Sequence, residues 1–282
     1  MKKAIITLTI GEAYQTEWCE HLRPGWEAYG RRHGYDILAL DSPIDNSERA
    51  VQRSVHWQKL LILEHPRVAG YDAVVWVDAD IAINAAKAPC IVKDSAADKV
   101  GVVSLNQVLC APPARFDNRL ARFYRYIGNK YGRVTAPTPA EWYAYAGLPG
   151  DVNEWTNTGV MVLRHAAHAG LLREVYERYE QNAFSIIENV PLSYHLFRTN
   201  SATIIDERFN CEYAWALLEH FPYLLLPAYA EDAQLRRLAV NSVWNNNWFV
   251  HFTGALGPLR RDYRLLIEGK EDFALFEALV TA

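Results

Sequence analysis

The chain has few cysteines, no strongly basic segment and no long apolar run, and each absence excludes a class of protein. Its four cysteines lack paired short spacings, so neither a zinc knuckle nor a small disulfide-bonded scaffold is predicted, and a reduced protein is the simplest interpretation. With a net charge of -4 and no lysine- or arginine-rich run, it offers no surface for duplex nucleic acid. No apolar stretch approaches the roughly 20 residues of a membrane span.

The amino terminus also lacks the features of a signal peptide. Met1-Lys2-Lys3 leads into the short apolar segment Ala4–Leu8, and Gly11-Glu12 follows in place of a small-residue cleavage site. We therefore expect a cytoplasmic protein without an integral membrane segment. Peripheral attachment to a membrane and the oligomeric state stay open.

The order of the apolar segments predicts an α/β protein with a Rossmann-like, mixed but mostly parallel sheet. Strands expected at 4–8, 35–40, 73–77 and 100–104 alternate with helical segments at 18–29, which Pro24-Gly25 breaks or shifts, and 55–64. Further strands are expected at 159–163, 202–205 and 248–251, with a helix at 191–197 and an apolar helical stripe between 171 and 179.

No linker or internal repeat marks a second domain, so we expect one domain over residues 1–282. It divides into a nucleotide-binding half at 1–110, an insertion at 111–150 and a second half at 151–282. The insertion is rich in proline, glycine and tyrosine, and a helix is expected in it at 119–126.

The most informative segment is the apolar strand Ala73–Val77, which ends in Asp78-Ala79-Asp80. In open α/β sheets ligands bind at the carboxyl ends of strands, and carboxylates at i and i+2 can both turn toward one hard cation. Such a cation would neutralise a departing diphosphate. Strand ends are also acidic where they merely meet solvent. The haloacid-dehalogenase phosphatases share the pattern, with the first aspartate as nucleophile, but there it usually opens the chain.

Several segments, in chain order, resemble a retaining family of A-type (GT-A) glycosyltransferases, glycosyltransferase family 34. They are His56-Trp57-Gln58-Lys59 with His65-Pro66, Val75–Asp80, Asn157-Thr158-Gly159-Val160 with Leu163-Arg164, Glu188-Asn189, Arg208-Phe209-Asn210, and His251-Phe252-Thr253-Gly254. The resemblance implies metal-dependent transfer of a sugar from a nucleoside-diphosphate sugar, with a UDP-sugar favoured, to a glycan or glycoconjugate acceptor with retention. The family's membrane anchor and stem are missing, which favours a cytoplasmic enzyme of bacterial type.

The resemblance assigns the metal to Asp78, Asp80 and His251. Mixed carboxylate and imidazole ligation beside a diphosphate suits Mn²⁺ better than Ca²⁺, with Mg²⁺ as the alternative. A histidine in an apolar strand is also typical of a hydrogen-bonded core residue. That interpretation stays open for His251.

The resemblance further assigns donor contacts, and the expected residues are Thr7, Thr9, Arg53, Lys59, Asp78, Ala79, Asn157, Gly254 and Arg260. Thr7 and Thr9 would meet the base and ribose, and Asn157 the donor sugar or the acceptor. A solvated helix face explains Arg53 and Lys59 nearly as well. The family commonly has a lysine for the diphosphate after its His-x-x-Gly motif, and here Arg260 or Arg261 would replace it.

Catalysis is assigned to Glu188 and Asn189, where the family usually has an acidic residue followed by glutamine. A carboxylate or amide beside the anomeric carbon could stabilise positive charge or act as a transient nucleophile, and the pattern does not choose between them. Glu188 could instead be a carboxylate that favours the dipole of a helix opening near Pro191.

The acceptor is expected at the aromatic part of the insertion, with Trp142 or Tyr143 as a stacking ring, although both rings could instead pack the insertion onto the sheet. Two other functions stay open. A phosphatase using Asp78 and Asp80 would hydrolyse a phosphoester without a sugar acceptor, and a non-catalytic glycan-binding protein would show no donor turnover. A nucleotidyltransferase is disfavoured, because the loop after the first strand, Thr9–Ala13, has a single glycine.

Overall fold

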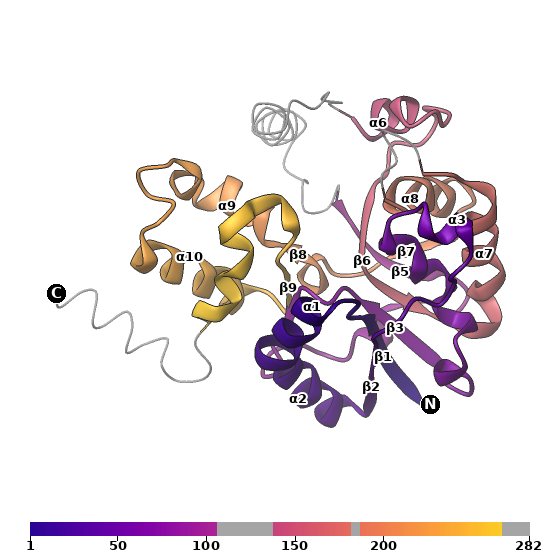
Figure 1. Cartoon of the computed structure of the whole chain (residues 1–282), viewed down its shortest axis with the longest axis horizontal. Coiled ribbons are helices and arrows are strands. Elements are labelled where there is room, and N and C mark those ends of the chain that lie inside the picture. The colour runs from indigo at the N-terminus through magenta and orange to yellow at the C-terminus, as the bar shows by residue number, and fades with distance from the viewer. Residues whose placement is uncertain (106–137, 182–186, 267–282) are drawn as a thin grey trace.

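The computed structural model describes residues 1–105, 138–181 and 187–266, and a six-stranded sheet in the order β2-β1-β3-β6-β5-β7 runs through it (Figure 1). Its strands are β1 (Lys3–Leu8), β2 (Tyr35–Leu40), β3 (Ala73–Val77), β5 (Val100–Ser104), β6 (Thr156–Leu163) and β7 (Ala202–Ile204). The strands β1, β2 and β3 are mutually parallel, β5 is parallel to β7, and β6 is antiparallel to both β3 and β5. The predicted mixed, mostly parallel sheet is therefore confirmed.

The alternation of side chains along each strand gives this sheet two buried faces. In β3, Val75 and Val77 belong to one apolar cluster and Val74 and Trp76 to the other. A strand that is covered on both sides has to be apolar at every position. This requirement explains the unbroken apolar run that precedes Asp78.

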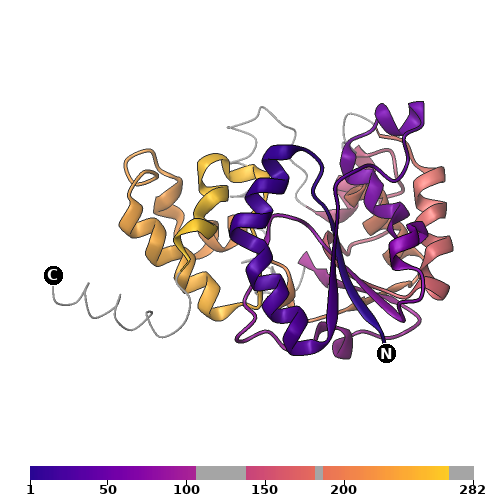
Figure 2. The same ribbon diagram turned by 60° about the horizontal axis from the view of Figure 1, so that its bottom comes forward.

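One face is covered by a helical rod that Figure 2 shows beside β1 in indigo. The rod consists of α1 (Glu12–Glu17), a π turn η1 (Trp18–Leu22) and α2 (Arg23–His33). The irregularity expected at Pro24-Gly25 takes the form of this wide turn just before Pro24, and the chain stays helical, since proline at a helix start loses no hydrogen bond. Gly25 is required where it stands, because a Cβ there would lie 2.8 Å from the Ile83 carbonyl oxygen.

The opposite face is covered mainly by η2 (Val55–Glu64), α7 (His165–Arg178) and α8 (Asn189–Arg198). The shorter elements are α3 (Glu48–Val51), η3 (Pro66–Val68), η4 (Ile91–Asp94) and α6 (Pro139–Tyr145). Helix α6 lies in the described part of the 111–150 insertion, residues 138–150, and Thr138 begins it with a capping box. The helix expected at 119–126 and Cys110 lie outside the described residues.

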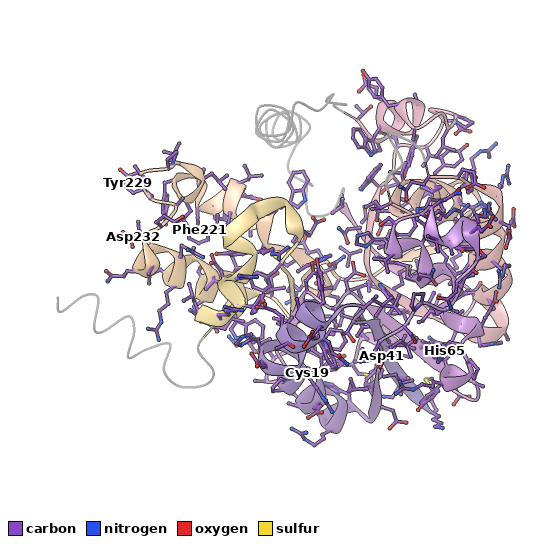
Figure 3. All side chains as sticks on the ribbon, in the orientation of Figure 1. Cys19, Asp41, His65, Phe221, Tyr229 and Asp232 are labelled. Carbon is purple, nitrogen blue, oxygen red and sulfur yellow. The ribbon has the colours of Figure 1, made fainter. Side chains whose placement is uncertain are left out.

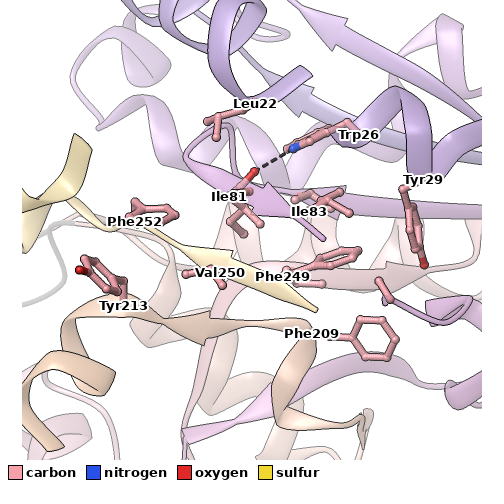
Figure 4. Packing of buried hydrophobic residues seen from close by; sticks show 14 of the residues in the cluster. Leu22, Trp26, Tyr29, Ile81, Ile83, Phe209, Tyr213, Phe249, Val250 and Phe252 are labelled. Carbon is pink, nitrogen blue, oxygen red and sulfur yellow. Dashed lines mark hydrogen bonds between the residues drawn. The ribbon is translucent and has the colours of Figure 1, made fainter. Parts of the chain in front are cut away.

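A second, three-stranded sheet follows the acidic motif, in the order β4-β9-β8. Its strands are β4 (Ile81–Ile83), β8 (Cys211–Glu212) and β9 (Phe249–His251), and the elements around it are η5 (Glu207–Phe209), α9 (Tyr213–His220), η6 (Pro222–Leu225), α10 (Ala233–Asn246) and η7 (Gly254–Leu265). Figure 4 shows Phe249 and Phe252 packed in the cluster beneath the rod, with the Trp26 indole donating 2.8 Å to the Ile81 carbonyl. This apolar packing holds β4 and β9 against the larger sheet.

The helices α9 and α10 form the outlying part of the molecule, where Figure 3 labels Phe221, Tyr229 and Asp232 far from His65. Asp232 caps α10 by accepting from the Gln234 and Leu235 amides at 3.0 and 2.9 Å. Within the described ranges, no helix combines the length and apolar character needed to cross a bilayer.

Candidate active site

A pocket of about 330 Å³ opens where β1 and β3 end. Leu8 and Ile10 from the end of β1, together with Tyr14 and Trp18 from the rod, form its apolar side. Its polar lining consists of Glu17, His56, Lys59, Asp78, Asp80, Arg260 and Arg261. The pocket thus has an acidic end at the strand β3 and a pair of arginines on η7.

The acidic end contains the predicted metal ligands. One ligand atom from each of Asp78, Asp80 and His251 lies within 4.8 Å of the others. The His251 Nε2 atom is 3.1 Å from an Asp80 oxygen and 3.8 Å from an Asp78 oxygen. Two carboxylates and one imidazole are hard and borderline ligands that fit a divalent cation such as Mn²⁺ or Mg²⁺.

Short-range structure brings these distant residues together. The chain turns directly after β3, with the Ile81 amide donating to the Asp78 carbonyl at 3.1 Å, and β4 begins there. Strand β9 pairs antiparallel with β4 in a register that places His251 opposite Ile81. The Phe252 amide then donates to the Asp80 carbonyl at 3.0 Å. The pairing of β4 with β9 therefore brings Asp78, Asp80 and His251 together.

The charged groups of this cluster shift one another's pKa values. Burial alone would lower the pKa of His251, but the charge and hydrogen bond of Asp80, with smaller contributions from Asp78 and Glu212, raise it to about 9. Burial would raise the pKa of Asp78, yet Lys59, His251 and His56 hold it below its usual value. The two carboxylates therefore favour the charged form of His251.

Gly159 is essential to the position of His251. A Cβ at residue 159 would lie 2.4 Å from His251 Cε1 and 2.7 Å from its Nδ1. The imidazole packs directly on the backbone of β6, so no larger side chain fits without displacing it. The glycine that the sequence placed in the Asn157-Thr158-Gly159 motif serves this close approach.

Lys59 joins the metal cluster to the predicted catalytic residue. Its ammonium lies 2.9 Å from an Asp78 oxygen and 2.9 Å from Glu188 Oε1, and only 3% of its side chain is exposed. Burial would lower the pKa of Lys59, but these two carboxylates outweigh it and raise the pKa. The structure thus places Lys59 inside the site and excludes the solvated-face interpretation for it.

Glu188 and Asn189 begin α8 beside β6. Glu188 Oε1 also accepts from the Thr158 hydroxyl at 2.7 Å, and the Thr158 amide donates 2.7 Å to Asn189 Oδ1. The second carboxylate oxygen, Glu188 Oε2, is buried and has no hydrogen-bond partner among the described residues. Such an oxygen retains acceptor capacity that a bound molecule could use.

Thr7 and Thr9 are at the predicted end of β1, but Leu8 and Ile10 are the residues that line the pocket. Successive side chains of an extended strand point to opposite faces, which explains this difference. Thr7 is fully buried with an unpartnered hydroxyl, and the Thr9 hydroxyl donates 3.4 Å to the Leu40 carbonyl.

Arg53 is placed elsewhere. Its guanidinium donates to the Tyr176 carbonyl at 2.9 Å and pairs with Glu180 at 2.8 Å, and it lies 4.5 Å from the centre of the Trp57 ring. These contacts at the end of α7 account for its burial. Arg53 is absent from the pocket lining, so its predicted donor contact has no geometric support.

The remaining donor residues lie at or near the pocket. Ala79 and Arg260 line it, as does Arg261, and Gly254 begins η7. The side chain of Asn157 is engaged by protein groups, since Oδ1 accepts from the Gly159 amide at 2.7 Å. Both Arg260 and Arg261, either of which could replace the family's lysine, therefore lie at the pocket.

Of the two predicted acceptor rings, Tyr143 is excluded as a stacking surface. Its side chain is completely buried, its hydroxyl donates 2.7 Å to the Glu154 carbonyl, and its ring stacks on Trp155 at 5.4 Å. Burial raises the pKa of Tyr143 as well. The prediction for Tyr143 is wrong because its ring is core. Trp142 is partly exposed, with an edge-on contact to Trp155 at 6.1 Å.

Three residues at the site were given no role by the sequence. Glu17 lines the pocket below the arginines, Asn210 contacts His251 Nδ1 at 3.0 Å, and Glu212 lies opposite His251 in the pairing of β8 with β9. Burial raises the pKa of Glu212. Asn210 stood in a motif of the resemblance and could have been singled out, whereas Glu17 and Glu212 carry no local signal.

Comparison with known proteins bears on the fold. No protein-family model and no curated protein matches the chain. The crystal structure of a glycosyltransferase involved in glycosylation of the major capsid of PBCV-1 superposes with a TM-score of 0.52 at 14% identity, covering 93% of this chain and 98% of that one. The chain has the GT-A glycosyltransferase fold.

Two further glycosyltransferase structures superpose less well. The galactosyltransferase LgtC, in complex with donor and acceptor sugar analogues, gives a TM-score of 0.48 at 13% identity over 96% of this chain and 99% of that one. The bifunctional glycosyltransferase WbbM gives 0.49 at 11% identity over 98% of this chain and 51% of that one. The superposition at a TM-score of 0.52 is the one that confirms the GT-A fold expected from the sequence, and the likeness to family 34 stays a resemblance.

Proposed function

We propose that the protein is a metal-dependent glycosyltransferase that moves a sugar from a nucleoside-diphosphate sugar, a UDP-sugar in the first place, to a glycan or glycoconjugate acceptor with retention. The observation that carries the proposal is the cluster of Asp78, Asp80 and His251 in the same pocket as Arg260 and Arg261. We take the chain as one GT-A domain over residues 1–282.

The two ends of the pocket complement a nucleoside diphosphate. The apolar side at Leu8, Ile10 and Tyr14 suits a base and ribose. A divalent cation held by the cluster would neutralise the charge that develops on a departing diphosphate. The guanidinium groups of Arg260 and Arg261 would grip its oxygens.

Glu188 and Lys59 would act on the sugar side. Lys59 holds Glu188 Oε1, so the carboxylate stays oriented while Oε2 keeps its free acceptor capacity. A buried carboxylate in this state would stabilise positive charge at the anomeric carbon as the sugar-phosphate bond breaks. Transfer with retention follows if the acceptor attacks from the face that the diphosphate leaves.

The test is donor turnover with a panel of UDP- and GDP-sugars, with Mn²⁺ or Mg²⁺ added and with a chelator. We expect slow donor hydrolysis that requires the cation and falls by about 100-fold or more in Asp80→Ala and His251→Ala, because each removes a ligand. Proton NMR of the first-formed product should show the anomeric configuration of the donor. An inverted anomer would contradict retention.

Other outcomes identify other functions. Hydrolysis of a simple phosphoester that depends on Asp78, without any sugar donor, would replace transfer by phosphatase chemistry. Glycan binding without donor turnover in any cation would leave a binding protein. Retained cation-dependent turnover in both Asp80→Ala and His251→Ala would remove the proposed metal site.

A further inference from the structure

The orientation of His251 can be traced back to a backbone amide of strand β6. The Gly159 amide can only donate, and it donates to Asn157 Oδ1 at 2.7 Å. The Asn157 side chain therefore presents its oxygen to this group and directs its amino group elsewhere. Asn157 also acts on the buried Glu212, because its side chain partly offsets the burial that raises the pKa of that carboxyl group.

Asn157 in turn orients Asn210. The Asn210 amino group lies 3.1 Å from the Asn157 carbonyl oxygen and 3.2 Å from Asn157 Oδ1. Both of these atoms are acceptors, so a flipped Asn210 amide would bring oxygen against two oxygens. The fully buried carboxamide of Asn210 is thereby held in one orientation, with Oδ1 facing His251.

Asn210 in turn fixes the protonation of His251, whose Nδ1 lies 3.0 Å from Asn210 Oδ1. Since Asn210 Oδ1 can only accept, Nδ1 has to carry a proton. In the neutral imidazole the other nitrogen, Nε2, then carries the lone pair, and Nε2 is the atom that faces Asp80 and Asp78. Binding of a metal through Nε2 requires this tautomer, and an acceptor beside Nδ1 favours it.

We propose that Asn210 is a positioning residue that selects the metal-binding tautomer of His251, and that Asn157 and the Gly159 amide set the orientation of Asn210. The inference rests on the proposed cation site and is independent of which sugar is transferred. It gives Asn157 a role in the metal site in addition to the donor-sugar contact that its sequence motif implies. Asn210 itself touches no cation.

The tautomer can be read directly in the full chain without metal. Nitrogen NMR of the protein with isotope-labelled histidine, recorded at about pH 10 so that the ring is neutral, reports which nitrogen carries the proton. The His251 signals are identified by their loss in His251→Gln. We expect protonated Nδ1 in the wild type. In Asn210→Leu, which removes the acceptor, Asp80 should draw the proton to Nε2.

Manganese affinity, measured as free Mn²⁺ by electron paramagnetic resonance, should follow the tautomer. Asn210→Leu should bind Mn²⁺ at least about 10-fold more weakly, as for loss of other residues that orient metal ligands. Asn210→Asp keeps an acceptor for Nδ1, although its second oxygen then faces the two oxygens of Asn157, so it should lose stability but hold Mn²⁺ within about threefold of wild type. A merely structural role predicts instead that Asn210→Asp weakens Mn²⁺ binding as much as Asn210→Leu.

Asn84→Leu is the matched control, because Asn84 is also buried and donates 3.0 Å to the Trp244 carbonyl away from the cluster. It should lose stability without losing Mn²⁺ affinity. Wild-type protein with protonated Nε2, or Asn210→Leu with wild-type affinity, would overturn the inference. Should Asn210→Leu fail to fold, Asn210→Asp decides alone. The expected tautomer and Mn²⁺ binding without sugar transfer would refute only the proposed function.

Discussion

The cation end and the arginine end of the pocket are built differently. Lys59 and His251 expose 3% and 4% of their side chains, and each also bonds to a buried residue, Lys59 to Glu188 and His251 to Asn210. At the arginine end, Arg261 and the neighbouring Arg264 on η7 expose 52% and 43% of their side chains and pair with Glu17 at the surface. Asp262, which follows Arg261, is fully buried and accepts from the Tyr213 hydroxyl at 3.0 Å. Surface pairs contribute little and exchange partners easily, whereas buried ones are costly to disturb. The cation end is therefore pre-formed, whereas under the proposed function Arg261 would turn from Glu17 to a diphosphate.

The sharpest test of the rigid end is Gly159→Ala. The new methyl group would overlap the His251 ring, so the ring or β6 has to move. We expect Mn²⁺ affinity to fall by about 10- to 100-fold. Gly170→Ala is the control, since nothing lies within 4 Å of that position on α7, and alanine there should favour the helix. Unchanged affinity in Gly159→Ala would mean that this end adapts too.

The pH dependence of metal binding tests the coupled charges of the same end. The pKa of His251 is raised to about 9, so its proton has to leave before Nε2 can bind a cation. Mn²⁺ affinity should rise about tenfold per pH unit from neutral pH and level off above about 9. In the metal-free protein, the free energy of unfolding should change in the opposite direction with pH. The pair of charged His251 with Asp80 stabilises the fold fully below about pH 6.5, and this stabilisation is lost as the pH rises through about 9. Calorimetry in buffers of different ionisation enthalpy would count the protons released when Mn²⁺ binds. Binding without release of a proton would contradict the assignment of His251 as a ligand.

The adaptable end should respond more mildly. Arg261→Gln removes a charge that lines the pocket, and we expect the donor KM to rise about fivefold, with less effect at high salt. Arg264→Gln is the comparison, because Arg264 pairs with Glu17 but is absent from the pocket lining. An equal rise in both variants would mean that the pair with Glu17, and not the diphosphate, sets the effect. Mn²⁺ affinity should stay unchanged in either.

The smallest effect is expected at the partly exposed Trp142. In Trp142→Ala the acceptor KM should rise about three- to fivefold, corresponding to about 1 kcal/mol of lost stacking, while donor hydrolysis stays near wild type. Tyr143→Phe, which loses the hydrogen bonds to Glu154 and Ser193, should lower the free energy of unfolding by about 1 kcal/mol without changing the acceptor KM. If Trp142→Ala loses stability and both activities together, its ring is core as well.

The sequence predicted the parts of this molecule that depend on local pattern. The apolar run before Asp78 is buried on two faces, and both the strand bounds at Val100–Ser104 and the pairing of Asp78 and Asp80 with His251 are confirmed. The direction of side chains was harder to predict. Tyr143 and Arg53 are residue types that often contact ligands, but here both side chains are buried in the protein. The second sheet was not expected as a unit, since β8 has only two residues and no periodicity. The contacts of Asn210 with His251 and Asn157 join residues 41 and 53 positions apart, and no short stretch of sequence contains them.

The place of β9 also has a consequence for how the chain folds. It is the central strand of its sheet, between β4, which ends at residue 83, and β8, which ends at residue 212. Neither neighbour has a partner in that sheet until the last of the three strands has been synthesised. Contacts over such long separations in sequence form late, because loop closure has to precede them. Binding of Mn²⁺ would therefore be a late event on the folding path, and a chain arrested before residue 249 would contain both aspartates without a metal site.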